Sequence, residues 1–469
     1  MSDDLLFRDF LASALVSTGF SRDPGAPPLV GLSSDLYFPP LEDLILSLSP
    51  AAPPEYLEIF RGRTEDLIRA RNAVPTTIPF SYHGDCLWYT QSDFLFNPAF
   101  REETLRANRH MDAIGSPWMI HECAQKTMEG YAFGLYAPPL LTPEGALVAR
   151  QGALALASSL NGRILLVETP PFPPHPTGPL DLATFFRIVT HDSPLGIGLD
   201  IGHCLTYLAV TGKRPDPQSL VAWLREFPLE RVVEIHVGGL TATLLEGEEC
   251  LIDDHSREVP DLLFDSLEAV GRSLSLPNLK GVALEVDNKS LPVIAREFPR
   301  FRKIVLSSFL ENPITGSRSP VFPAPQLPGN IRLGPEGSDV CLSARKGYET
   351  LAQGLMEKGL SPYATTLYPL EVWNFGGSMP DMFPETLSLL EKEGIAAQDT
   401  FVDFFNRHPR SETTPFDYLQ IKVRRTLEWV DTLSEHLPDP DTYLTIRAMA
   451  EKEAGLLILA QEQFNGDPL

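Results

Sequence analysis

The sequence is short of basic residues. It has 38 Lys and Arg against 62 Asp and Glu, which gives a formal net charge of −24. Nucleic-acid binding needs clustered Lys and Arg that displace counterions from phosphates, so this composition disfavours a nucleic-acid partner. A basic peptide or a small molecule is easier to accommodate at such a surface.

Cysteine and long apolar runs are also scarce. The five cysteines form no C-x-x-C pair, which is typical of free thiols in a reducing compartment. No apolar run reaches the roughly 18 residues that span a bilayer. The N-terminus, MSDDLLFRDFLASALV, starts acidic and lacks the basic region of a secretory signal. We therefore expect a cytoplasmic protein without a membrane partner.

Short apolar runs alternate with longer amphipathic stretches between residues 29 and 290. Such alternation is typical of a parallel sheet buried on both faces. The expected strands are 29–33, 56–60, 77–83, 117–121, 163–168, 195–200, 231–236 and 280–285. Eight units over roughly 250 residues predict a TIM (β/α)8 barrel, an α/β fold. An open doubly wound sheet is the main alternative, but no Gly-rich phosphate loop follows the first strand.

The remaining segments complete the predicted domain organisation. Residues 1–27 read as an N-terminal helix, 28–311 as the barrel, and 312–330 as a linker rich in Pro, Gly and Ser. Residues 331–469 show apolar spacing near 3.6 and predict a mostly α-helical C-terminal domain. Because that domain has only two histidines, His408 and His436, we expect it to recognise a substrate or partner.

Nine side chains that commonly bind metals occur in or just after these apolar runs. In a barrel of parallel strands, residues at the strand C-termini meet at one mouth, where imidazoles and carboxylates hold divalent metals. The nine are His83, His121, Glu168, Asp200, His203, His236, Asp253, His255 and Glu285.

Local context strengthens several of these predictions. Glu168 closes the apolar run ILLVE, where an unpaired carboxylate would be costly. Asp200 and His203 belong to D-I-G-H, whose Gly202 permits a tight turn toward the same mouth. Asp253 and His255 are two residues apart, so in an extended segment both point to one side.

Nine nitrogen and oxygen ligands exceed the needs of one ion and fit two or three. Mixed imidazole and carboxylate ligands suit iron(II), zinc or manganese without choosing among them. Four nearby polar residues are candidates to orient a substrate or move protons: Asp85, Glu122, Lys126 and Asp287.

The ordered ligands resemble those of two barrel families. The order D-x-x-H, H, D-x-H, E is similar to the endonuclease IV and xylose isomerase-like barrels. The stretches GIGLDIGHCLTY, ERVVEIHVGG and LIDDHSREVPD resemble more closely the multinuclear non-heme iron-dependent oxidative enzymes, which modify ribosomally made peptides. This resemblance covers about residues 28–290. The chain departs from that family's pattern at Gly202 and His203, where Asn-Asn is usual, at Thr169, usually Asn, and at Ile120, often acidic.

The resemblance implies an oxidoreductase with two or three iron ions and dioxygen as co-substrate. It implies a peptide substrate, with or without a leader sequence, that is modified at a Cys or Asp side chain. Residues 331–469 could then replace a separate partner protein.

Three alternatives remain open from the residues. They are a zinc hydrolase of the endonuclease IV-like class, a divalent-metal sugar isomerase or epimerase, and a non-catalytic metal-bearing scaffold. Zinc or manganese would replace iron in the first two.

Overall fold

The computed structural model describes residues 3–309, apart from 17, 22–25, 35, 37–38, 49–52, 61, 129–130, 173–176, 246–247, 256 and 288. Beyond them it describes residues 346–351, 373, 379–407, 418–437 and 439–465. The chain forms two compact units. The first comprises Met1–Gln125 and Pro138–Leu351, and the second comprises Lys126–Ala137 and Ala352–Leu469.

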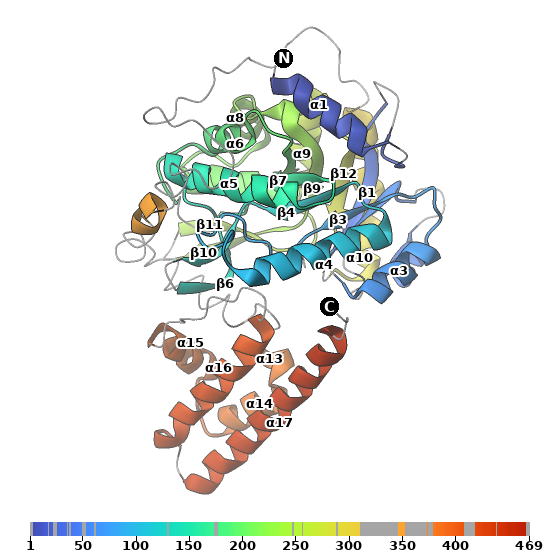
Figure 1. Cartoon of the computed structure of the whole chain (residues 1–469). Coiled ribbons are helices and arrows are strands. Elements are labelled where there is room, and N and C mark those ends of the chain that lie inside the picture. The colour runs from blue at the N-terminus through green and yellow to red at the C-terminus, as the bar shows by residue number, and fades with distance from the viewer. Residues whose placement is uncertain are drawn as a thin grey trace. The chain divides into compact units, whose positions relative to one another are not determined.

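The first unit is a closed barrel of eight parallel strands, in the order β1-β12-β9-β8-β7-β4-β3-β2 (Figure 1). The strands are β1 (Leu29–Ser34), β2 (Tyr56–Phe60), β3 (Phe80–His83), β4 (Trp118–Glu122), β7 (Ile164–Glu168), β8 (Gly196–Asp200), β9 (Val232–Val237) and β12 (Gly281–Glu285). Each predicted strand is present, so the predicted TIM barrel is confirmed. Strand β3 begins three residues later than predicted, and β4 continues one residue further, to Glu122.

Helices surround the barrel and connect its strands (Figure 1). They are α1 (Asp3–Ala14), α2 (Leu41–Ser47), α3 (Thr64–Ala73), α4 (Pro98–Ile114), α5 (Pro143–Ser158), α6 (Leu182–Thr190), α7 (Ile201–Val210), α8 (Pro217–Leu224), the 3₁₀ turn η1 (Leu229–Arg231), α9 (Asp261–Ser273) and α10 (Leu291–Ser308). Side-chain caps fix several starts: Asn97 accepts from Ala99 N–H before α4, and Thr142 accepts from Gly145 N–H before α5. Helix α4 ends at Gly115, whose φ of 72° favours glycine.

The N-terminal segment closes one end of the barrel. Phe7, Leu11 and Leu15 join one buried cluster with Phe20, Tyr56, Trp118 and other residues of the barrel interior. The ring centroids of Phe20 and Trp118 lie 4.2 Å apart. This packing fills the interior with side chains at the end opposite the strand C-termini, so the end at the strand C-termini is the one left for a ligand site.

Two antiparallel hairpins interrupt the alternation of strands and helices. Strands β5 (Gln125–Met128) and β6 (Tyr131–Ala137) pair with each other after β4, and β10 (Leu240–Leu245) and β11 (Glu248–Asp253) pair after β9. Neither hairpin was predicted. The second ends at Asp253, so this predicted ligand lies at the end of a strand.

The second unit contains a helical C-terminal region, as predicted. Its helices are α13 (Met379–Met382), α14 (Pro384–Lys392), α15 (Ala397–Arg407), α16 (Tyr418–Thr432), the 3₁₀ turn η3 (Leu433–Glu435) and α17 (Pro440–Asn465). Buried Glu453 on α17 accepts hydrogen bonds from the Glu385 and Thr386 N–H groups at the start of α14. The predicted linker 312–330 and His408 lie outside the described residues. None of the described helices is both long and apolar enough to cross a membrane.

A buried lysine makes the stability of this unit depend on pH. Lys422 on α16 is buried, and its Nζ donates a 3.0 Å hydrogen bond to the carbonyl oxygen of Trp373. Burial lowers the pKa of Lys422 to about 7. An unfolded lysine has a pKa of about 10.4, so between about pH 7 and 10 the unfolded state binds more protons. The free energy of unfolding therefore rises with pH across that window.

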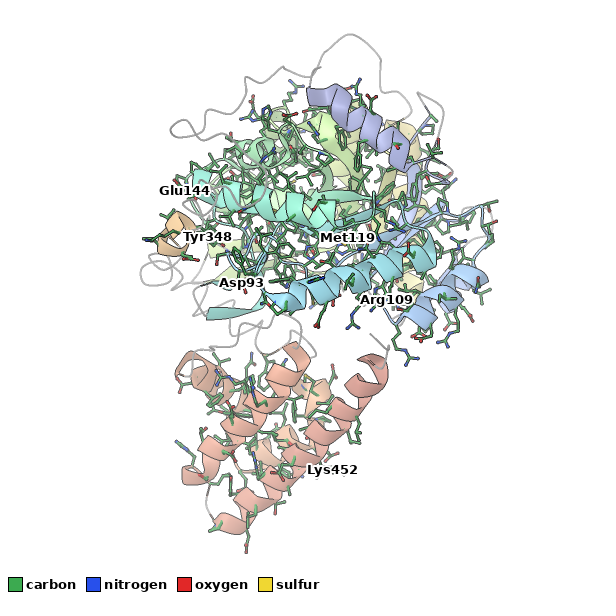
Figure 2. All side chains as sticks on the ribbon, viewed as in Figure 1. Asp93, Arg109, Met119, Glu144, Tyr348 and Lys452 are labelled. Carbon is green, nitrogen blue, oxygen red and sulfur yellow. The ribbon has the colours of Figure 1, made fainter. Side chains whose placement is uncertain are left out.

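We expect Lys422→Met to remove this rise and to stabilise the unit near pH 7 by on the order of 1–3 kcal/mol. Calorimetric unfolding between about pH 6.5 and 10 measures both effects. Lys452→Met is the matched control, because Lys452 is exposed on α17 (Figure 2). An unchanged pH dependence in the Lys422 variant would contradict the prediction.

Candidate metal centre

The strand C-termini bring eight of the nine predicted ligands into one continuous network of side-chain contacts. These eight are His83, Glu168, Asp200, His203, His236, Asp253, His255 and Glu285. A further carboxylate, Glu58 on β2, joins them. Four groups of these residues, one of which also includes Glu122, have ligand atoms within 4.8 Å of one another, which is close enough to share an ion. Three of the groups share residues, and the fourth, His203, Asp253 and His255, stands by itself.

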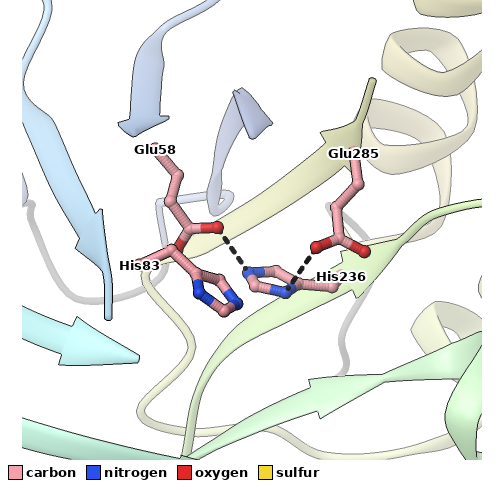
Figure 3. Close-up of side chains that lie close together, drawn as sticks. All are labelled: Glu58, His83, His236 and Glu285. Carbon is pink, nitrogen blue, oxygen red and sulfur yellow. Dashed lines mark ion pairs between the residues drawn. The ribbon is translucent and has the colours of Figure 1, made fainter. Parts of the chain in front are cut away.

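The deepest group consists of Glu58, His83, His236 and Glu285 (Figure 3). His236 lies between two carboxylates: its Nε2 is 3.1 Å from Glu58 Oε1, and its Nδ1 is 3.4 Å from Glu285 Oε1. The rings of His83 and His236 are stacked, with centroids 5.9 Å apart. All four side chains are buried. Two imidazoles and two carboxylates in such an arrangement can supply the four protein ligands of one divalent ion.

Glu168 at the end of β7 connects this group to two others. Its Oε1 is 2.9 Å from His236 Nδ1, and its Oε2 is 3.2 Å from His83 Nε2. The same carboxylate belongs to one group with Asp200 and His236 and to another with His83 and Glu122. A carboxylate with both oxygens turned toward different ligand groups is suited to bridge two ions.

The outer group contains His203, Asp253 and His255. Asp253 lies between the imidazoles, with Oδ2 3.4 Å from His203 Nε2 and Oδ1 3.1 Å from His255 Nε2. The side chains of Asp253 and His255 are 17% and 18% exposed, whereas that of His236 is fully buried. The cluster therefore opens to solvent at the Asp253 end, where a substrate can reach it.

Local backbone structure fixes the Asp200–His203 pair. Asp200 ends β8 and caps α7, because its Oδ1 accepts a 2.6 Å hydrogen bond from the His203 N–H. The Nδ1 of His203 lies 2.6 Å from the Thr169 carbonyl oxygen. If Nδ1 donates this bond, the ring presents Nε2 to the cluster as a lone-pair donor.

Gly238, just after β9, gives His255 its space. A Cβ at this position would lie 2.5 Å from the His255 imidazole and 3.0 Å from Glu285 Oε2. Any larger residue would push two candidate ligands apart.

His121 stands apart from the cluster. Its Nε2 accepts a 2.9 Å hydrogen bond from Leu87 N–H, and its Nδ1 lies 3.0 Å from the Glu122 carbonyl oxygen. Both ring nitrogens are thus occupied by the backbone. Side chains alternate along a strand, and Trp118 of β4 points into the barrel, where it bonds to Glu234. Glu122 therefore faces the interior, and His121 faces the surrounding layer.

This alternation gives a testable distinction between neighbours. We expect Glu122→Gln to reduce metal binding by at least about tenfold, since it removes a charged ligand. His121→Gln is expected to leave metal binding close to that of the parent. Elemental analysis of both variants after identical purification measures the difference. Loss of metal only in the His121 variant would contradict the alternation argument.

Glu58 is the candidate ligand that sequence reasoning missed. It lies in the middle of the predicted strand YLEIF, whereas most of the predicted ligands lie at strand ends. Its register partners are Ser33 on β1 and Ser81 on β3, and Ser33 is also the partner of Glu285. The sequence did contain a signal for Glu58. Burying its carboxylate inside an apolar strand without a partner costs free energy, as it would for Glu168.

The four polar residues predicted to orient a substrate or move protons have different positions. Glu122 is a possible ligand, as described above. Asp287 Oδ2 lies 3.6 Å from His255 Nδ1, at the open end of the cluster. Asp85 accepts a hydrogen bond from the Cys86 N–H. The side chain of Lys126 lies outside the described residues.

The pKa values show a strongly negative field at the cluster. Burial alone would lower the pKa of His83 and His203, but the surrounding carboxylates outweigh burial and raise both to about 10. Burial raises the pKa of Glu122 and Asp200 to about 7. In contrast to His83 and His203, burial lowers the pKa of His121 to about 4. A field that holds protons on imidazoles also attracts divalent cations, and metal binding would release those protons.

Unsatisfied polar atoms are concentrated in the same place. Glu58 Oε1 and Oε2, Asp200 Oδ2, His203 Nε2 and Glu285 Oε2 are buried and have no hydrogen-bond partner among the described residues. Leaving such atoms unpaired costs roughly 1–3 kcal/mol each. Glu58, Glu168, Asp200, Asp253 and Glu285 make ion pairs with histidine, and none with a described Lys or Arg. The donor set therefore fits bound divalent metal ions.

Solved structures with a similar fold include several barrel enzymes. Endonuclease IV from Thermus thermophilus is 17% identical, with a TM-score of 0.38, and covers 60% of this chain and 100% of its own. A D-tagatose 3-epimerase-like protein is 15% identical, with a TM-score of 0.38, and covers 60% of this chain and 98% of its own. D-psicose 3-epimerase from Clostridium cellulolyticum is 10% identical, with a TM-score of 0.38, and covers 60% and 99%. No curated protein matches the chain.

One family model matches part of the barrel. Residues 152–305 match the RiPP precursor modification enzyme MbnB/TglH/ChrH. The matched segment holds seven members of the cluster, from Glu168 to Glu285. The resemblance to this family of peptide-modifying enzymes is thus confirmed over this segment, and the match implies an enzyme.

Proposed function

We propose that the protein is a multinuclear non-heme iron enzyme that uses dioxygen to oxidise a Cys or Asp side chain of a ribosomally made peptide. One observation carries this proposal. The segment that matches the family model supplies Glu168, Asp200, His203, His236, Asp253, His255 and Glu285 to one buried cluster. Chemically, such a cluster can hold several divalent ions close together.

The candidate ligands form an inner group, an outer group and a bridging carboxylate between them. Glu58, His83, His236 and Glu285 would hold one ion in the closed interior. His203, Asp253 and His255 would hold another at the open end, and Glu168 with Asp200 or Glu122 provides for a third. Iron bound there would supply the redox chemistry, namely dioxygen activation and removal of a hydrogen atom from the substrate.

The protein's own side chains would position the peptide and keep water out. Solvent reaches the cluster at Asp253 and His255, so a substrate thiolate or carboxylate would approach from that side. Phe60 stacks on His83 with centroids 4.1 Å apart and shields the inner ligands. Asp287, beside His255, is placed to accept or return a proton at the open end.

The helical second unit would select the peptide. Separate partner proteins accompany enzymes of the resembling family, and residues 352–469 could take that role within the same chain. We place the protein in the cytoplasm, where its free thiols would stay reduced.

Elemental analysis of protein purified anaerobically tests the proposal. We expect two or three iron ions per chain and oxygen consumption that depends on a Cys- or Asp-containing peptide. Stoichiometric zinc that persists after growth in iron-supplemented medium would overturn it.

That zinc result would favour a second candidate, a zinc-dependent hydrolase. The position of His203 supports it, because this residue joins Asp253 and His255 in the outer group. The resembling iron family usually has Asn there. Hydrolysis would proceed without oxygen consumption, so the same two measurements separate the candidates.

A further inference from the structure

A groove runs between α4 and α5, away from the metal cluster. Its volume is about 580 Å³, within the range of ligand sites. Helix α3 packs on α4 and α5 packs on α6, but α4 and α5 themselves make few contacts. The groove is therefore a gap in the helical layer of the barrel.

Helix α4 presents one regular face to this groove. The lining residues Arg101, Leu105, Asn108 and Arg109 recur at the three- and four-residue spacing of a helix face. Ala155 and Leu156 on α5, with Ser159 just after its end, form the opposite wall. Asn108 Nδ2 donates a 2.8 Å hydrogen bond to the Ser159 carbonyl oxygen and joins the two walls.

The groove has an apolar part that solvent reaches. Leu105 is 54% exposed, and Phe96, in the loop that leads into α4, is 68% exposed. Phe94 and Phe100 line the groove with ring centroids 4.7 Å apart. Exposed large apolar side chains beside an aromatic floor are typical of surfaces that bind a partner.

The charged residues that line the groove are Arg101, Arg109 and Asp112, and because Asp112 pairs with Arg163 the two arginines give the groove a net positive charge. Neither Arg101 nor Arg109 makes an ion pair within the part of the chain that the structure describes, and Figure 2 shows where Arg109 lies on α4. Their neighbours differ, because Arg106 pairs with Glu103 and Arg163 pairs with Asp112. The Nη2 of Arg109 and the Oδ1 of Asn108 are also buried without a hydrogen-bond partner in the described part of the chain.

We propose that this groove docks an acidic, amphipathic segment of a peptide, and the choice of a peptide rests on the proposed function. Arg101 and Arg109 are eight residues apart, or about 12 Å along the helix. Two carboxylates at that separation would pair with both guanidinium groups. Apolar side chains between them would cover the exposed side chain of Leu105.

The charge of the chain favours a short acidic peptide over a second copy of the chain as the occupant of the groove. The net charge of −24 repels another copy, as it repels acidic molecules in general. A short acidic segment can use the two groove arginines without bringing a large negative surface along. The same field would favour a basic peptide elsewhere, but the groove itself would reject it.

Direct binding to the metal-free, full-length chain tests the proposal. The probe is a fluorescein-labelled synthetic peptide of Glu and Leu at helical spacing, and its companion has Lys in place of Glu. We expect fluorescence anisotropy to detect binding of the acidic probe only. Arg101→Glu with Arg109→Glu should weaken that binding at least tenfold. Arg8→Glu with Arg225→Glu is the control: it makes the same charge change at exposed arginines outside the groove.

Three results would overturn the proposal: no binding of the acidic probe, equal binding of both probes, or equal weakening in the control variant. Self-association in sedimentation that is lost on changing the two groove arginines would overturn it in favour of a second copy. The double variant Arg101→Gln with Arg109→Gln is a milder change at the same positions. If its melting temperature is unchanged, a loss of binding cannot be attributed to misfolding. Because the binding assay uses metal-free protein, its result does not depend on whether the protein binds iron. Failure of the docking proposal is therefore distinguishable from failure of the proposed function.

Discussion

His236→Ala is expected to remove at least one metal ion per chain and to lower peptide oxidation by at least about 100-fold. His236 is central to the buried part of the cluster, since its two nitrogens face Glu58, Glu168 and Glu285. Its removal leaves three carboxylates without the imidazole between them. Elemental analysis gives the metal content, and oxygen consumption with a peptide gives the activity.

The control for this variant is His110→Ala. His110 is also fully buried, but it lies on α4 and its Nδ1 is 3.0 Å from the Tyr82 hydroxyl. Its loss creates a cavity of similar size outside the cluster. If both variants lost metal equally, the effect would reflect general destabilisation and His236 would not be a ligand.

Glu58→Gln should have a comparably large effect although the two side chains have nearly the same shape. Both Glu58 oxygens are buried without a hydrogen-bond partner among the described residues, and Oε1 faces His236. The substitution removes the negative charge that would bind the inner ion. We expect loss of at least one metal ion, measured by elemental analysis, and protein that is equally or more stable without metal.

Glu234→Gln is the matched control, because Glu234 is another buried carboxylate in the barrel. Its oxygens are already satisfied by 2.6 Å hydrogen bonds from the Tyr56 hydroxyl and the Trp118 Nε1–H. This variant should keep its metal. Retention of all metal in Glu58→Gln would contradict a ligand role for Glu58.

The fold was predictable because its signal is repeated and physical. Each barrel strand is buried on both faces, so each appears as a short apolar run, and eight such runs define the barrel. The hairpins β5–β6 and β10–β11 were not predictable in this way. A hairpin that follows a barrel strand breaks the alternation of strands and helices from which the barrel was predicted.

The candidate site was predictable where the strand's last residue faces inward. Glu168, Asp200 and Glu285 end their strands and lie in the cluster, and His236 lies one residue before the end of β9. At β4 the inward-facing residue is Glu122, one position beyond the predicted strand end at His121, and His121 lies on the other face of the strand. Glu58 was missed for the opposite reason, since it lies before the end of its strand. In both cases the alternation of side chains along the strand determines which residue faces the cluster, and residue type alone does not.

The hairpin β5–β6 has a consequence for how the chain can be divided. Residues 126–137 belong to the second unit, yet both their ends continue into the barrel unit. No single cut in the chain can therefore separate the two units. For the same reason, a barrel expressed alone to residue 351 would retain residues 126–137, although they belong to the second unit.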